Sequence, residues 1–118
     1  MSIPELYTEL AGDYAGTMSR LMKEDRIVKY LTKFTQAQDY NDLMANLEIK
    51  NYADAFRNVH TLKGVSLNLG LSKLAEVSSA LTEALRNGDP VVDISGMVED
   101  VKNEYKRTID ILTAGLGL

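Results

Sequence analysis

The stretch FRNVHTLKGVSLNLG, residues 56–70, decides how the rest of the chain is interpreted. It contains the only histidine of the protein, His60, followed three residues later by Lys63 and four residues later by Gly64. The surrounding pattern is helical, and a glycine inside a helix costs roughly 0.5–1 kcal/mol relative to alanine. Because Gly64 stands one turn after the histidine, we expect the missing side chain to give an advantage at this place that offsets the cost in helix stability.

Apolar residues around this stretch predict one helix from about Tyr52 to Asn68, with Gly70 as its stop. At the helical rotation of about 100° per residue, His60 lies roughly 130° from the centre of the core side, so we expect it to be exposed. Gly64 lies on the same side as His60, which favours free space beside the imidazole over tight packing between helices. The core side holds Tyr52, Ala55, Phe56, Val59, Leu62, Ser66 and Leu69.

His60, Lys63 and Gly64 together describe an exposed imidazole with free space beside it and a cation in reach. A histidine side chain is largely neutral near pH 7, and its ring nitrogen is then nucleophilic. Lys63 is a neighbour at the i+3 position and can act as a point charge for phosphate. Each residue alone has a simpler interpretation: His60 could be a surface histidine without a function, and Lys63 could serve only solubility. The combination suits a histidine that is phosphorylated.

The remaining sequence is helical throughout and lacks strand-like alternation. Ser2 and Glu5 have capping-box spacing for a short helix to about Leu10, and Asp13 can cap a second short helix to about Met22. Four longer helices are expected over residues 25–48, 52–68, 71–87 and 92–114. We predict Asp25 as the cap of the first, which could bend near Gln36–Gln38, Ser72 as a cap of the third and Val92 as the start of the fourth. Short loops between them predict an all-α fold, an antiparallel up-down four-helix bundle with two short N-terminal helices, in a single domain over residues 1–118.

Composition excludes several classes of function. The 118 residues carry a formal charge of −4, which speaks against nucleic-acid binding. The absence of cysteine and the single histidine speak against a metal or haem site. No apolar run approaches the ~20 residues of a membrane span, and the N-terminus lacks the layout of a signal peptide. We therefore expect a cytoplasmic protein without membrane contact and, since no sustained heptad seam is visible, a monomer.

The segment HTLKGVSLNLG resembles the signature of histidine-containing phosphotransfer domains of bacterial phosphorelays, H-x-x-K-G-x-[SA]-x-x-x-G. The resemblance continues into LSKLAEVSSALTEAL and covers nearly the whole chain. It implies a four-helix bundle with His60 as the phosphorylated residue, on Nε2. It further implies that Lys63 stabilises the phosphoryl group and that Gly64 gives the partner clearance.

The resemblance also implies partners and cofactors. The partners would be receiver domains of response regulators and of a hybrid histidine kinase, and the Mg²⁺ would come from the receiver, so that the chain needs no cofactor of its own. Such domains lack kinase activity. Phe56, Arg57, Leu67 and Asn68 flank His60 and are expected to contact the partner. Many relatives carry Gln or Glu on the following helix against the imidazole, and here Thr82 stands at that position and could hydrogen-bond the ring.

Three alternatives remain beside the relay. The chain could be the phosphoacceptor domain of a chemotaxis-type kinase, although it runs from Met1 to Leu118 without dimerisation or ATP-binding domains, so that a stand-alone protein is expected. It could be a helical adaptor that is not phosphorylated, which the retained His60, Lys63 and Gly64 disfavour. The dimerisation hairpin of a sensor kinase usually has an acidic residue after the histidine, whereas Thr61 follows here.

Overall fold

The computed structural model describes every residue from Met1 to Leu118. The chain is all-helical and has no strand, which confirms the predicted fold class at this level. The two short N-terminal helices of the prediction are α1 and α2. The helices are α1 (Ile3–Leu10), α2 (Tyr14–Leu21), α3 (Glu24–Gln36), α4 (Asp39–Glu48), α5 (Tyr52–Asn68), α6 (Ser72–Leu85) and α7 (Ser95–Leu116).

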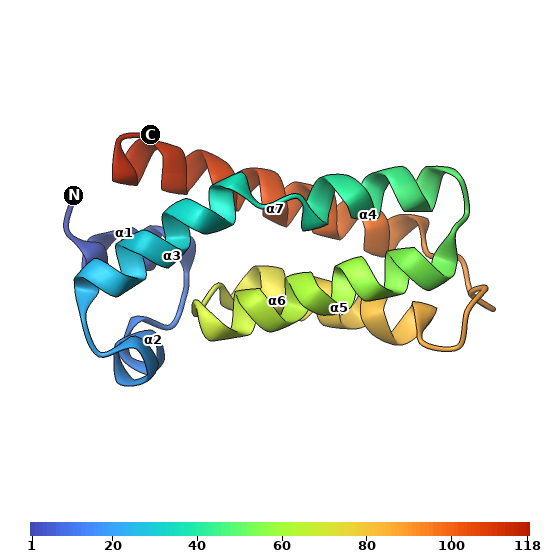
Figure 1. The fold of residues 1–118 in the computed structure, drawn as a ribbon, viewed down its shortest axis with the longest axis horizontal. Coiled ribbons are helices and arrows are strands. Elements are labelled where there is room, and N and C mark those ends of the chain that lie inside the picture. The colour runs from blue at the N-terminus through green and yellow to red at the C-terminus, as the bar shows by residue number, and fades with distance from the viewer.

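The longer helices lie along the long axis of a molecule that measures 43 × 25 × 20 Å (Figure 1). Helix α5 packs against both α4 and α6, and α6 packs in turn against α7. Helix α3 packs against α2 and α7, and α1 packs against α7. The apolar core lies between these helices, and the fully buried side chains include Leu31, Leu43, Val59, Leu81 and Leu112.

The predicted single helix from Asp25 to Glu48 is in fact two helices. The backbone of Ala37 is extended, with φ −72° and ψ 150°, and this ends α3 within the region where a bend was expected. Helix α3 begins at Glu24 after Lys23, so the prediction of Asp25 as the N-cap was wrong by two residues. The carboxylate of Asp25 still lies in the first turn, near the positive end of the helix dipole.

The ends of the last three helices follow local hydrogen bonding. Gly70 ends α5 in the left-handed conformation (φ 69°), as expected from its position. Ser72 does not cap α6, because its hydroxyl donates to the carbonyl of Gly70 (3.5 Å). Helix α7 begins at Ser95 and not near Val92, because the Asp93 carboxylate accepts from the backbone N–H of Ser95 (2.9 Å) and so fixes the start.

Helices α1 and α2 and their connection form what we call the N-terminal clasp, residues 3–21, which holds the turn between α5 and α6 (Figure 1). Gly70 is pressed so closely against the clasp that a Cβ atom would lie 2.2 Å from Thr17 Oγ1. The clasp therefore fixes where the histidine helix ends. Its hydrogen bonds run from Tyr7 Oη to Leu69 O (2.7 Å), from Asp13 N to Gly70 O (2.9 Å), and from the Arg20 guanidinium to Leu67 O (3.0 Å) and Asn68 O (3.2 Å).

Candidate functional site

Helix α5 presents His60 to solvent because its apolar residues define the opposite face. The helix starts at the Asn51 cap, whose side chain accepts from the backbone N–H of Asp54 (3.3 Å). Its buried residues are Ala55, Val59, Leu62 and Ser66, all on the predicted core side. His60 is exposed, as its place on the helical wheel predicts.

Gly64 opens the space next to His60. It is exposed, and a Cβ atom built on it would meet no heavy atom within 4 Å. Tight packing between helices therefore does not explain the glycine. Gly64 and His60 are both exposed and lie one turn apart, so a partner could approach the imidazole across this position.

The imidazole is flanked by an aromatic ring on its own helix. Phe56 stacks on His60, with ring centroids 5.8 Å apart and ring planes 19° from parallel. Arg86, from the end of α6, lies over the same Phe56 ring, with its guanidinium carbon 5.5 Å from the centroid. Stacking of this kind limits the orientations that the imidazole can adopt.

Glu83 of α6 brings a carboxylate close to the site. It accepts two hydrogen bonds from Arg86, at 2.7 and 3.1 Å. These hydrogen bonds lower the pKa of Glu83, and the charges of Arg86, Lys63 and His60 lower it further, although burial acts in the opposite direction. The carboxylate therefore lies within electrostatic reach of both Lys63 and His60. Sequence reasoning assigned no role to Glu83 or Arg86, and their i, i+3 spacing on α6 was the available signal.

Thr82 does not present a donor to the imidazole. Its side chain is fully buried, and its hydroxyl donates to the backbone carbonyl of Ser78 (2.7 Å). The expectation that Thr82 hydrogen-bonds the ring is therefore corrected, because its only hydroxyl proton is used within its own helix.

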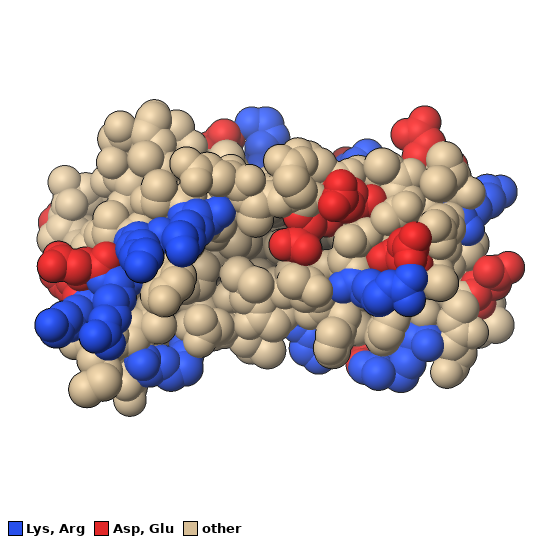
Figure 2. Space-filling view, in the orientation of Figure 1, with Lys and Arg blue, Asp and Glu red and all other residues tan.

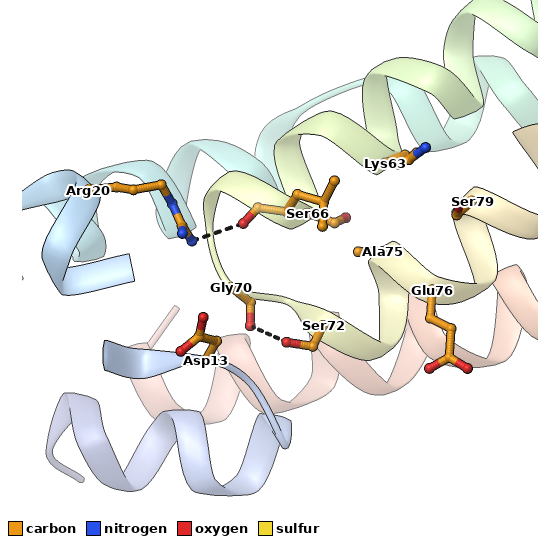
Figure 3. Close-up of a pocket in the computed structure, with 10 residues that line it drawn as sticks. Asp13, Arg20, Lys63, Ser66, Gly70, Ser72, Ala75, Glu76 and Ser79 are labelled. Carbon is orange, nitrogen blue, oxygen red and sulfur yellow. Dashed lines mark hydrogen bonds between the residues drawn. The ribbon is translucent and has the colours of Figure 1, made fainter. Parts of the chain in front are cut away.

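Lys63 lines a hollow of about 430 Å³ between α2, α5 and the start of α6 (Figure 3). It forms no ion pair with another side chain, so its ammonium remains available for a new negative group. Figure 3 shows Lys63 extending from α5 near Ser79 of α6, while Glu76 points away from it. At the other end of the hollow, Arg20 is held by backbone carbonyl groups.

The four residues predicted to contact a partner differ in what they present. Phe56 is half-buried under Arg86, and Arg57 is exposed but paired with Asp54. Leu67 is 56% exposed, so no helix shields it. Asn68 is exposed, and its carbonyl accepts from Arg20. All four lie on α5, although Leu67 and Asn68 stand at its far end.

Two structural findings bear on other classes of function. No group of three or more His, Cys, Asp or Glu side chains lies in an arrangement that could hold a metal ion. None of the helices is both long enough and apolar enough to span a membrane.

Comparison with known proteins gives one match. The family model described as Hpt domain matches residues 29–111, a span that includes His60, Lys63, Gly64, Glu83 and Arg86. The match begins inside α3 and ends inside α7, so α1 and α2 lie outside it. No curated protein and no solved structure matches the chain significantly.

Proposed function

Because the chain belongs to the Hpt domain family, whose members perform histidine phosphotransfer in two-component signalling, we propose that it is a phosphorelay intermediate. It accepts a phosphoryl group on His60 from a receiver-domain aspartate and passes it to another receiver domain. The observation that carries this proposal is the surface around His60, where the imidazole is exposed, Gly64 leaves open space and Lys63 has no partner.

The chemistry requires little of the protein beyond positioning. The lone pair of His60 Nε2 attacks the phosphorus of the aspartyl phosphate, and a P–N bond forms. The P–O bond to the aspartate breaks, and the carboxylate leaves with its electron pair. The phosphorylated ring can then release its Nδ1 proton to solvent. Return transfer reverses these steps on a second receiver.

Each residue of the site has a proposed role in this exchange. Lys63 stabilises the charge of the phosphoryl group, because an ammonium at the i+3 position is a point-charge phosphate ligand. Gly64 gives the receiver room to reach Nε2. Phe56 limits the rotation of the imidazole. Glu83 holds the Arg86 guanidinium, which lies over the Phe56 ring.

We also propose the architecture, the cofactor source and the partners with which the protein acts. The four longer helical stretches, with α3 and α4 counted as one, form an antiparallel up-down bundle in a single domain over residues 1–118. Hpt domains are phosphocarriers and generally not enzymes, and we propose that this chain has no kinase activity. The Mg²⁺ is supplied by the receiver. The protein acts as a cytoplasmic monomer, and its phosphoryl donor is the receiver domain of a hybrid histidine kinase.

The proposal is tested by phosphotransfer. Purified protein is incubated with ³²P-labelled phosphorylated receiver domains and Mg²⁺, and we expect acid-labile, base-stable label on this chain. His60→Gln should remove all of it, because His60 is the only histidine. Label that persists in His60→Gln, or no transfer from any receiver of the source organism, would contradict the proposal. Labelling by an isolated kinase ATP-binding domain but by no receiver would favour the chemotaxis-type alternative.

A further inference from the structure

A groove of about 370 Å³ lies between α3 and the C-terminal half of α5, next to the open face of Gly64. Most of its lining is apolar. We call it the α3–α5 groove. The lining residues that matter here are Tyr30, Lys33 and Phe34 from α3 and Gly64, Val65 and Asn68 from α5.

The groove lies next to the break between α3 and α4. Helix α4 packs against α5, whereas α3 packs against α2 and α7. The extended backbone of Ala37 separates the two helices, and Ala37 itself lines the groove, so the groove lies beside this break.

Apolar side chains at the groove are exposed to solvent. Tyr30 is 40% exposed and Val65 is 36% exposed. Apolar groups gathered beside a reactive side chain are typical of a protein contact surface. Gly64 belongs both to the groove and to the face that carries His60, so a partner that reaches the imidazole across Gly64 also covers the groove.

The mouth of the groove is basic although the chain is acidic overall. The ammonium groups of Lys29 and Lys33 each lie 5.7 Å from the centre of the Tyr30 ring, and neither forms an ion pair. Figure 2 shows basic side chains gathered over this part of the molecule, whereas acidic groups occupy the middle of the same face. The chain as a whole has a formal charge of −4.

We propose that the α3–α5 groove docks a receiver domain through an apolar side chain flanked by carboxylates on one of the receiver's helices. The apolar side chain enters between Tyr30 and Val65, and the carboxylates pair with Lys29 and Lys33. Charge complementarity favours this occupant over a second copy of the chain, since two copies of charge −4 repel. The inference rests on the proposed relay function and adds the chemistry by which a receiver is selected.

The test separates docking from chemistry. The donor is a phosphorylated receiver domain that labels the wild type, and the variants are Lys29→Glu/Lys33→Glu and the milder Lys29→Gln/Lys33→Gln. For the Glu variant we expect KM for the receiver to rise about tenfold or more while kcat stays within about twofold, because lost charge pairs weaken encounter and binding. The Gln variant should give a smaller rise. The wild-type KM should increase with salt, and the Glu variant should lose this dependence.

Lys73→Glu is the control for a charge reversal away from the groove, because Lys73 is exposed on α6 and forms no ion pair. Chemical labelling with phosphoramidate reports the reactivity of His60 without a receiver and should be equal in all variants. If the Lys29/Lys33 variants match Lys73→Glu while wild-type transfer works, the groove proposal fails and the relay function stands. If no receiver labels the wild type, both fail. Light scattering tests the alternative that a second copy of the chain fills the groove. A wild-type dimer that is absent in the Lys29→Glu/Lys33→Glu variant would contradict a receiver domain as the occupant.

Discussion

Phe56 and His60, one turn apart on α5, stack ring against ring with centroids 5.8 Å apart and planes 19° from parallel. The contact joins a half-buried residue to an exposed one, because Phe56 also packs against the apolar core. The rigid interior of the bundle thereby limits how a solvent-exposed imidazole can turn. Arg86 over the same ring links this contact to α6.

Replacing Phe56 with leucine should slow phosphoryl transfer by about tenfold, because small losses of alignment at a reacting group have large effects on rate. The variant should lose about 1 kcal/mol of unfolding free energy with the aromatic contact. Tyr40→Leu is the control, since it removes the stack of Tyr40 on Tyr105 (3.8 Å) away from the site. Rapid-quench transfer kinetics and urea unfolding measure both effects. Equal transfer rates in the two variants would contradict a positioning role.

Gly64→Ala should stabilise the protein by about 0.5–1 kcal/mol, because the added methyl group meets no neighbour and alanine favours the helix. Gly64→Leu should also fold, but its side chain should obstruct the receiver and reduce transfer by about tenfold or more. Thermal unfolding and transfer rates test this pair. Gly96→Leu is the control, because Gly96 on α7 also has no atom within 4 Å of an added Cβ. Normal transfer in Gly64→Leu would refute the role of Gly64 as clearance.

Lys63→Gln should leave stability unchanged within about 0.5 kcal/mol, because Lys63 has no ion pair to lose. Once His60 is phosphorylated, the same change removes a charge-assisted contact, so we expect transfer several-fold to about tenfold slower and a shorter phosphohistidine lifetime. The decay of ³²P label on the isolated protein measures that lifetime. Lys73→Gln should behave as the wild type. Identical decay in both variants would exclude Lys63 from phosphoryl stabilisation.

The raised pKa of Tyr7 predicts that the protein loses stability at alkaline pH. Burial raises the pKa of Tyr7 to about 12, so the folded state favours the neutral phenol. This stabilisation is complete below the ordinary tyrosine pKa of about 10 and is lost as the pH rises through about 12. At pH 8, Tyr7→Phe should be less stable by about 1 kcal/mol, because it lacks the hydrogen bond to Leu69. Urea unfolding should show this difference shrinking between pH 10 and 12. A constant difference would contradict the assignment.

The periodicity of α5 predicted the exposure of His60 and the buried face around Val59, because a regular helix fixes the direction of every side chain. Periodicity did not predict the extended backbone of Ala37, which ends α3 without a proline or glycine. The i, i+3 spacing of Glu83 and Arg86 is compatible with an ion pair, but their position near Phe56 depends on which face of α6 meets α5. Thr82 was expected at the imidazole from the family resemblance, whereas its side chain is buried and its hydroxyl donates within its own helix.

The N-terminal clasp folds together with the helices that the family model matches, because it is hydrogen-bonded to the end of the histidine helix. The family match begins at residue 29, yet Tyr7, Asp13 and Arg20 supply the donors for four carbonyl groups at the end of the histidine helix. A fragment trimmed to the matched span would leave those carbonyls to water and uncover the apolar residues beneath them. The segment that must fold as one domain is thus longer than the segment that the family model matches. An expression fragment meant to report on His60 should therefore include the residues before 29.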